Sequence, residues 1–135
     1  MKRLLASTKG LTTVEFALVG PCFLMMMMFI IDGARAVWTY QTLQEVATNS
    51  ARCAALNKTG CTNSSEVKSF AVARARASGV TLADTSVTLA TAQTCNAMGG
   101  MTKVTISSPY AGATTRLLPS TITTLTTDSC FPTIS

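Results

Sequence analysis

The sequence predicts an α+β fold in which one long N-terminal helix carries a small domain with a second helix and an antiparallel sheet. Three observations predict it. An uncharged apolar run covers residues 16–31, a helical period without proline or glycine continues over residues 34–56, and a period of two replaces it after Gly79. A chain of 135 residues accommodates one small domain beside a hydrophobic segment.

The first expected element is a membrane-spanning helix over residues 11–33. Counted from Leu11, the apolar segment is about 20 residues long, which spans the ~30 Å hydrocarbon core at about 1.5 Å per residue. Lys2, Arg3 and Lys9 precede it. Because positive charge stays on the cytoplasmic side, we expect a cytoplasmic N-terminus and export of the remaining chain.

The helix is expected to continue past residue 33 as an amphipathic segment. Apolar residues recur there at three- and four-residue steps and define one face, made of Val37, Tyr40, Leu43, Ala47, Ala51 and Ala54. Pro21 lacks an amide donor and crowds the preceding turn, so a kink or a local opening is expected near Gly20 and Pro21. Residues 34–135 are expected to form an exported domain that includes this amphipathic continuation.

The second half predicts one further helix and several short strands. Asn63 is placed to cap a helix, with Glu66 three residues on as in a capping box, and Gly79 is expected to end that helix after Ser78. Alternating apolar residues then predict strands, and turn residues separate them. The expected strands contain Val80 and Leu82, Val87 and Leu89, Val104 and Ile106, and residues 121–127, with a turn over residues 96–100.

Charge and composition exclude several classes of function. The chain has no histidine, which removes the commonest general base and a frequent metal ligand, and its carboxylates are scattered singly. We therefore expect no enzyme, no cofactor and no metal. The net charge is +5, but without residues 1–10 eight basic residues face six acidic ones, which leaves +2. No dense basic patch remains, so nucleic acid is not an expected partner.

Four of the five cysteines lie beyond the apolar segment, which itself contains Cys22. Four cysteines in a small domain predict two disulfides in an oxidising compartment. We favour Cys53 with Cys61, at the end of the long helix, and Cys95 with Cys130, which would tie the tail to a strand end. Three connectivities are possible. A zinc site is the alternative, although the spacings are wide and there is no CxxC motif.

Glu15 lies where lipid makes a charge costly. A carboxylate deep in a bilayer costs roughly 2.5 kcal/mol or more, and no Lys or Arg follows Lys9 within one turn of it. A cut between Gly10 and Leu11 would supply a cation, because it frees an α-amine with a pKa of about 8 and makes Glu15 the fifth residue. Glu15 can pair with the amine of its own chain or with that of a neighbouring subunit, and pairing between neighbours would set a fixed axial stagger between parallel helices.

The segment KGLTTVEFAL, residues 9–18, resembles the processing site of type IV pilins: a basic residue, a glycine, the cut, and a glutamate five residues on. The longer pattern over residues 9–56, with the apolar run, GAR and ATNSARCAA, resembles TadE-like pseudopilins of tight-adherence pili. The tail resembles them loosely, through Cys61, the strands and the closing CFP. Leu11 stands where many pilins have an aromatic residue.

The resemblance implies that a membrane-embedded prepilin peptidase cuts after Gly10 and that the new N-terminus is methylated. The mature chain would be a non-catalytic minor pilin, E-like or F-like, because the short major pilins of this system lack an exported domain of this size. The implied partners are the peptidase, other major and minor pilins, the inner-membrane assembly platform and the membrane. The implied location is the bacterial inner membrane with the C-terminal domain in the periplasm, or the pilus fibre or tip.

Two alternatives stay open. Ala34-Arg35-Ala36 is a pattern that signal peptidase prefers, and cleavage after Ala36 would release a secreted, disulfide-linked soluble domain beginning at Val37. The first residue of the mature chain, Leu11 or Val37, separates the two processing routes. A pilin that binds DNA at a tip is the other alternative, and a steep salt dependence would mark it.

Overall fold

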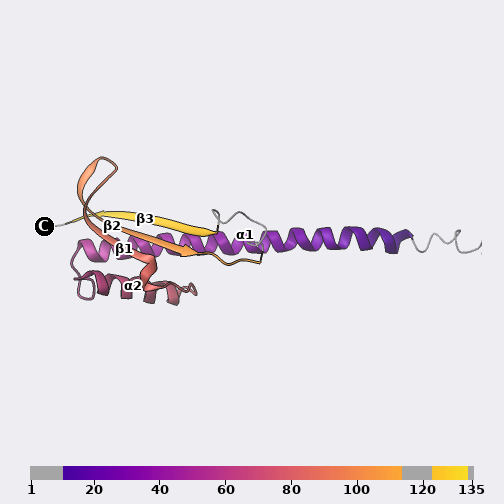
Figure 1. Ribbon diagram of the computed structural model, residues 1–135, viewed down its shortest axis with the longest axis horizontal. Coiled ribbons are helices and arrows are strands. Elements are labelled where there is room, and N and C mark those ends of the chain that lie inside the picture. The colour runs from indigo at the N-terminus through magenta and orange to yellow at the C-terminus, as the bar shows by residue number, and fades with distance from the viewer. Residues whose placement is uncertain (1–10, 114–122, 134–135) are drawn as a thin grey trace, which may run out of the picture.

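The computed structural model describes residues 11–113 and 123–133 (Figure 1). The expected leader over residues 1–10, including Gly10, lies outside the described residues. The elements follow in the order α1 (Leu11–Ala55), α2 (Ser64–Ala77), the 3-10 helix η2 (Asp84–Ser86), β1 (Val87–Cys95), β2 (Met98–Pro109) and β3 (Thr124–Pro132). The fold is therefore α+β, with a long apolar N-terminal helix, a second helix and a three-stranded antiparallel sheet, as the sequence predicts.

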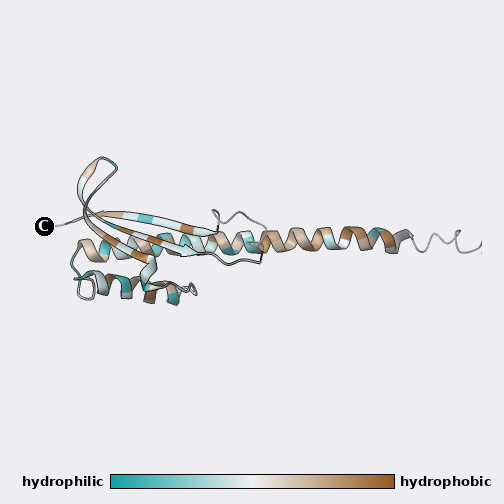
Figure 2. Ribbon diagram, in the orientation of Figure 1, coloured by the Kyte–Doolittle hydropathy of each residue, from teal (hydrophilic) through white to brown (hydrophobic). Residues whose placement is uncertain are grey.

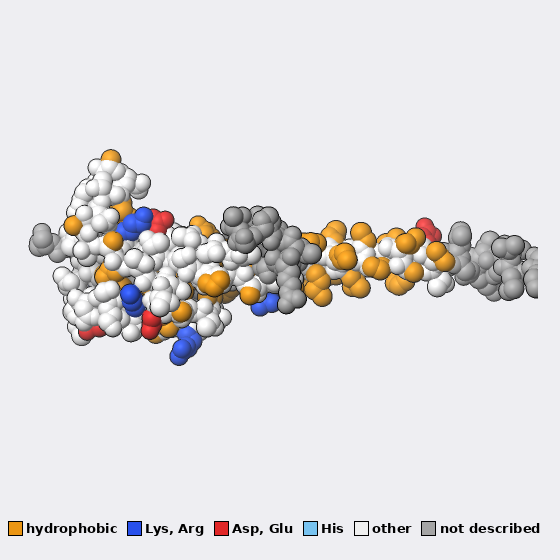
Figure 3. Space-filling view, viewed as in Figure 1, with side chains coloured by type: hydrophobic (Ala, Val, Ile, Leu, Met, Phe, Trp, Pro, Cys, Tyr) orange, Lys and Arg blue, Asp and Glu red, His pale blue; other side chains and the backbone are white. Residues whose placement is uncertain are grey.

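Helix α1 has 45 residues, so it is roughly 70 Å long. Its first half projects from the rest of the molecule as a single rod, and its second half lies within the domain (Figure 1). Figure 2 shows that hydrophobic residues dominate the projecting half, and Figure 3 shows apolar side chains along it. The expected continuation of the helix beyond residue 33 is confirmed.

The buried face of α1 begins later than the helical period predicts. Leu43, Ala47 and Ala51 are fully buried as expected, but Val37 and Tyr40 are 57% and 44% exposed. The helical period identifies an apolar face, but it does not show how far along that face the covering elements extend. The sequence pattern also omits other buried residues of this half, namely Thr42, Val46, Ser50, Cys53 and Ala55.

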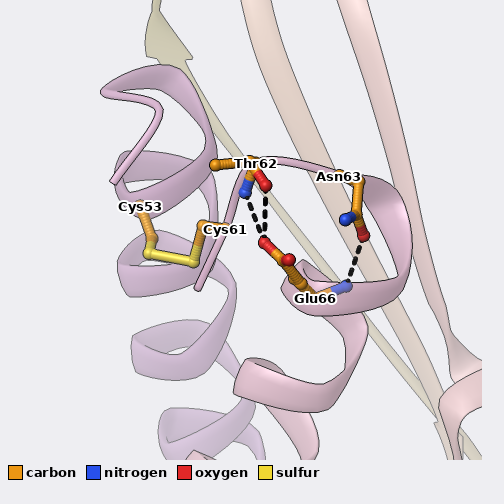
Figure 4. The surroundings of a disulfide bond; sticks show 5 residues. All are labelled: Cys53, Cys61, Thr62, Asn63 and Glu66. Carbon is orange, nitrogen blue, oxygen red and sulfur yellow. Dashed lines mark hydrogen bonds between the residues drawn. A yellow bond between two sulfur atoms is a disulfide. The ribbon is translucent and has the colours of Figure 1, made fainter. Parts of the chain in front are cut away.

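Two side chains form hydrogen bonds at the start of helix α2: Asn63, just before the helix, and Glu66, in its first turn (Figure 4). The Glu66 amide donates to Asn63 Oδ1 at 2.9 Å, as a capping residue requires. Glu66 Oε2 accepts from the Thr62 hydroxyl at 2.7 Å and from the Thr62 amide at 2.8 Å. The return bond thus goes to the residue before the cap instead of to the cap itself. These bonds, the hydroxyl first, lower the pKa of the Glu66 carboxyl below its ordinary value of 4.5.

The other end of α2 is closed by Gly79, as expected. The Val80 amide donates to the Ala75 carbonyl at 2.9 Å, and the Gly79 amide donates to the Arg76 carbonyl at 3.0 Å. This pair of bonds is the Schellman arrangement, which requires a left-handed residue, and Gly79 has a φ of +78°. Val80 is buried immediately after the turn.

The sheet has the order β1-β2-β3, and both pairs are antiparallel. Asn96 and Ala97 form the turn between β1 and β2 with φ values of 50° and 65°, which is typical of a two-residue hairpin. The expected turn over residues 96–100 is therefore too long, because Met98 already belongs to β2.

Two expected strands need correction. Val80 and Leu82 are buried, but they precede η2 in a segment without strand pairing, so the strand expected there is wrong. Alternate burial also occurs in an extended connection that has no neighbouring strand. The last strand, expected over residues 121–127, is β3 and runs from Thr124 to Pro132; residues 121 and 122 lie outside the described residues.

The second half of α1 lies between α2 and the sheet (Figure 1) and contacts α2, β2 and β3. Much of the core consists of small residues: α2 contributes Val67, Ala71 and Ala75, all fully buried. Small side chains allow backbones to approach closely, which compensates for the few large residues available. The Thr127 hydroxyl on β3 donates to Gln44 Oε1 on α1 and connects the sheet to the helix.

Two disulfides close the domain. Cys53 is bonded to Cys61, which joins the end of α1 to the loop before α2 (Figure 4), and Cys95 is bonded to Cys130, which joins the end of β1 to β3. This is the pairing favoured from the sequence. The loops span 8 and 35 residues, for which chain entropy predicts about 2.5 and about 4 kcal/mol of stabilisation. Such support suits a small domain with a limited core.

Candidate assembly site on the N-terminal helix

The projecting half of α1 presents large apolar side chains on all sides. Each large hydrophobic residue from Val14 to Ile31 is between 44% and 78% exposed. Figure 3 shows apolar side chains along this half of the helix on the face in view. A helix that is apolar all round needs lipid or other helices as its surroundings. Among the described residues, α1 is the one helix long and apolar enough to cross a membrane.

Glu15 is exposed near the start of this apolar surface. It is the one charged residue between Thr13 and Ile31 in the sequence. No residue in the described part of the chain forms a hydrogen bond or ion pair with it. Since α1 begins at Leu11, one turn separates that residue from Glu15, which is about 6 Å of helical rise. The position therefore offers a carboxylate that a cation at the helix start can reach.

Pro21 lies inside α1, and the helix is continuous on both sides of it. Proline has no amide hydrogen, so the carbonyl four residues earlier, on Ala17, lacks its usual helical donor. A Cβ added at the preceding Gly20 would lie 3.9 Å from the Phe16 ring, which is an ordinary contact. The kink expected at Pro21 stays a prediction.

Asp32 marks the boundary between the two halves of α1 and is only 6% exposed. The Tyr110 hydroxyl donates to the Asp32 carbonyl at 3.0 Å. Gly112 lies against both residues, because a Cβ added there would be 2.8 Å from the Tyr110 ring and 3.4 Å from Asp32 Oδ2. The loop after β2 thus closes over the helix at this point. The contact joins residues 78 positions apart, and no local pattern in the sequence indicates it.

A basic pocket of about 390 Å³ lies near the C-terminal end of α1. Arg52, Lys58 and Arg74 line it, and within the described part of the chain none of them pairs with a carboxylate. The sequence shows these residues as separate charges. Three cations are few beside the roughly 6 to 10 phosphate contacts of strong DNA-binding proteins, so the pocket does not favour the DNA-binding alternative.

The described residues contain no cluster of side chains suited to holding a metal ion. No group of three or more His, Cys, Asp or Glu side chains there is placed to hold a metal ion. The four cysteines of the zinc alternative are in disulfides and provide no thiolate ligand. The zinc alternative is therefore wrong.

Residues 10–52 match the family model of TadE-like proteins. The match covers Glu15, Pro21 and Asp32, and it ends one residue before Cys53. No curated protein and no solved structure matches the chain. TadE-like proteins form a structural, pilin-like family connected with the Tad pilus. The similarity to TadE-like proteins thus lies in residues 10–52, which include the projecting half of α1 and most of its packed half.

Proposed function

We propose that this protein is a minor pilin-like subunit that helps to assemble or prime a type IV tight-adherence pilus. The observation that carries the proposal is the construction of α1. Its apolar half is exposed and has one carboxylate near its start, while its other half is packed into a disulfide-bonded domain. A membrane anchor does not require Glu15, whereas a helix that must align with its neighbours gains a charged pairing site from it.

The proposed maturation step is cleavage after Gly10 by a prepilin peptidase. Leu11 becomes the first residue, and its α-amine, which the family resemblance implies is methylated, lies one turn before Glu15. The amine of a neighbouring subunit then pairs with Glu15. An unpaired carboxylate in apolar surroundings costs roughly 2.5 kcal/mol or more, so axial positions that leave Glu15 unpaired are disfavoured.

The proposed organisation follows from the same helix. Residues 1–10 are the cytoplasmic leader, residues 11–33 cross the inner membrane, and residues 34–135 form the exported domain. Two disulfides support this orientation, since they persist in the periplasm and at the cell surface. The partners are the peptidase, other major and minor pilins and the assembly platform. Pro21 is the proposed point at which the helix bends as it passes from the membrane into the pilus.

The packing of the domain argues against release by signal peptidase after Ala36. That bond lies within α1, so the helix would have to unwind for cleavage. Cleavage there would also remove Asp32, whose carbonyl accepts the Tyr110 hydroxyl. Sequencing the mature N-terminus distinguishes the two routes: Leu11 supports the proposal, and Val37 contradicts it.

The register role is tested by Glu15→Gln in cells that produce the pilus. We expect the variant to be processed and to reach the membrane at the normal level, but its recovery with the other pilins should fall by about tenfold or more, since 1.4 kcal/mol corresponds to a factor of ten. Thr13→Gln, two residues away on the same exposed half of the helix, is the matched control and should behave as the unaltered protein. Normal recovery of Glu15→Gln with intact piliation would refute the role.

A further inference from the structure

Beyond Asp32 the helix keeps an exposed surface that is both aromatic and apolar. Val37, Trp38 and Tyr40 are 57%, 63% and 44% exposed, and Arg35 is exposed about one turn before Trp38, so the four residues surround the helix. We call these four residues the collar. Arg35 and Trp38 also line a shallow hollow of about 320 Å³ next to the end of α2. The collar directly continues the exposed apolar half of α1.

Helix geometry places the collar at a definite height above the proposed membrane segment. Trp38 lies 27 positions after Leu11 and 23 after Glu15, which is about 40 Å and about 35 Å of rise. A bilayer is about 30 Å thick in its hydrocarbon core and about 40–45 Å with both headgroup layers. Helical side chains also point back toward the N-terminus, so the indole of Trp38 reaches toward the membrane. Whether the helix enters the membrane at Leu11 or at Glu15, the collar lies near the outer headgroup layer.

The domain also covers the carboxylate that lipid would disfavour at this position. Asp32 lies three residues before Arg35, the first residue of the collar, where lipid would disfavour a carboxylate, and the loop after β2 covers it. A Cβ at Gly112 would lie 2.8 Å from the Tyr110 ring, so a larger residue there would displace that ring. The loop therefore holds the domain against the same level of the helix at which the hydrocarbon ends.

We propose that the collar docks on the phospholipid headgroup layer at the outer face of the membrane, so that the domain rests on the bilayer before assembly. Indole and phenol rings favour this layer because they are apolar with one polar atom, and the Arg35 guanidinium matches lipid phosphates. Continuity with the apolar half of α1 favours lipid over a protein partner. The inference rests on the membrane-spanning helix of the proposed function.

Trp38 is the single tryptophan of the chain, so its fluorescence reports on the collar alone. The full chain is reconstituted in vesicles of phosphatidylethanolamine and phosphatidylglycerol that contain phospholipid brominated either near the headgroup or near the end of the acyl chain. We expect shallow bromine to quench Trp38 about twofold more than deep bromine. Iodide in the water should quench it about threefold less than it quenches free tryptophan.

Two variants calibrate the depth scale. Trp38→Phe combined with Phe23→Trp moves the reporter to the exposed middle of the apolar half, where deep bromine should quench more strongly. Trp38→Phe combined with Phe131→Trp moves it to β3, where neither lipid should quench it.

Alkaline extraction of the same vesicles separates the two proposals. If the chain is released, the membrane-spanning helix and the collar both fail. If the chain is retained but bromine does not quench Trp38, or deep bromine quenches it best, only the collar is overturned. Protection of Trp38 that appears only at high protein-to-lipid ratio would make the collar a contact between copies and would also overturn the proposal.

Discussion

The two halves of α1 share one helical geometry and have opposite surroundings. Large apolar residues from Val14 to Ile31 are at least 44% exposed, whereas the buried residues from Leu43 to Ala55 are at most 9% exposed. The exposed half is rich in large side chains, and the packed half buries Ala47, Ser50, Ala51 and Ala55. The two halves therefore differ in side-chain size: small residues let α2 and the sheet approach the packed half, and large residues stay exposed on the other half.

The exposed half also suits a change of surroundings. Met25 to Met28 are consecutive, and each is between 44% and 66% exposed. Thioether side chains are flexible and adapt to irregular neighbours. A helix that leaves lipid and then packs against other helices benefits from such adaptable contacts, while the packed half must keep one arrangement.

The largest expected effect comes from making the same substitution in each half. Leu43 is fully buried, so Leu43→Ala should lower the free energy of unfolding of the domain by about 2–5 kcal/mol. Leu18 is 74% exposed, and Leu18→Ala should leave it unchanged within about 0.5 kcal/mol. Denaturant unfolding in detergent, followed by near-ultraviolet circular dichroism, measures both. Equal losses would mean that the exposed half is part of the folded core.

The next largest effect is on membrane insertion and comes from placing a lysine in each half of α1. Met26 is 56% exposed at the middle of the apolar half, so Met26→Lys should disfavour membrane insertion by about 2.5–3.5 kcal/mol. Thr48→Lys places the same charge on the exposed side of the packed half and should insert normally. The fraction of chain that resists alkaline extraction measures insertion. Unchanged insertion of Met26→Lys would show that this half does not lie in lipid.

The smallest expected effect concerns the start of α2, far from the apolar half. Hydrogen bonds from Thr62 lower the pKa of Glu66 in the folded state, so this contact adds stability at pH values above the ordinary 4.5. The contribution is lost as the pH falls through the lowered folded-state pKa. Glu66→Gln should therefore reduce stability at neutral pH and flatten its decline in acid.

The neighbouring cap provides the control for that pH dependence. Asn63 does not titrate, so Asn63→Ala should lower stability by about 1 kcal/mol at neutral and acidic pH alike. Thermal unfolding over the acidic range compares the variants. If the stability of Glu66→Gln falls in acid as steeply as that of the unaltered protein, the acid dependence comes from other carboxyl groups.

Signals that act within a few residues were predictable. The ends of α2 follow from Asn63 and Gly79, because a cap and a left-handed turn each depend on neighbouring backbone groups. The pairing of Cys53 with Cys61 joins neighbouring segments of the chain. The strand predicted from the alternation of Val80 and Leu82 was wrong. A period of two shows which residues are buried, but not whether a partner strand lies beside them.

The candidate site divides in the same way. Glu15, Pro21 and the uncharged run are visible in the sequence, because their meaning depends on the local order of charge and on the length of one helix. The exposure of Val37 and Tyr40 and the basic pocket around Arg74 depend on which distant segments reach the helix. Periodicity contains no information about that.

The sequence by itself determined a long helix with an apolar first half, one carboxylate near its start, and the α+β class of the domain behind it. These properties depend on the order of residues within short segments, which fixes the position of charges, the hydrophobic period and the length of the helix. Only the tertiary structure decided where the domain begins to cover the helix and that Tyr110 closes over Asp32. Such contacts join residues far apart in the chain, and they form only when the sheet and α2 pack together on one face of α1.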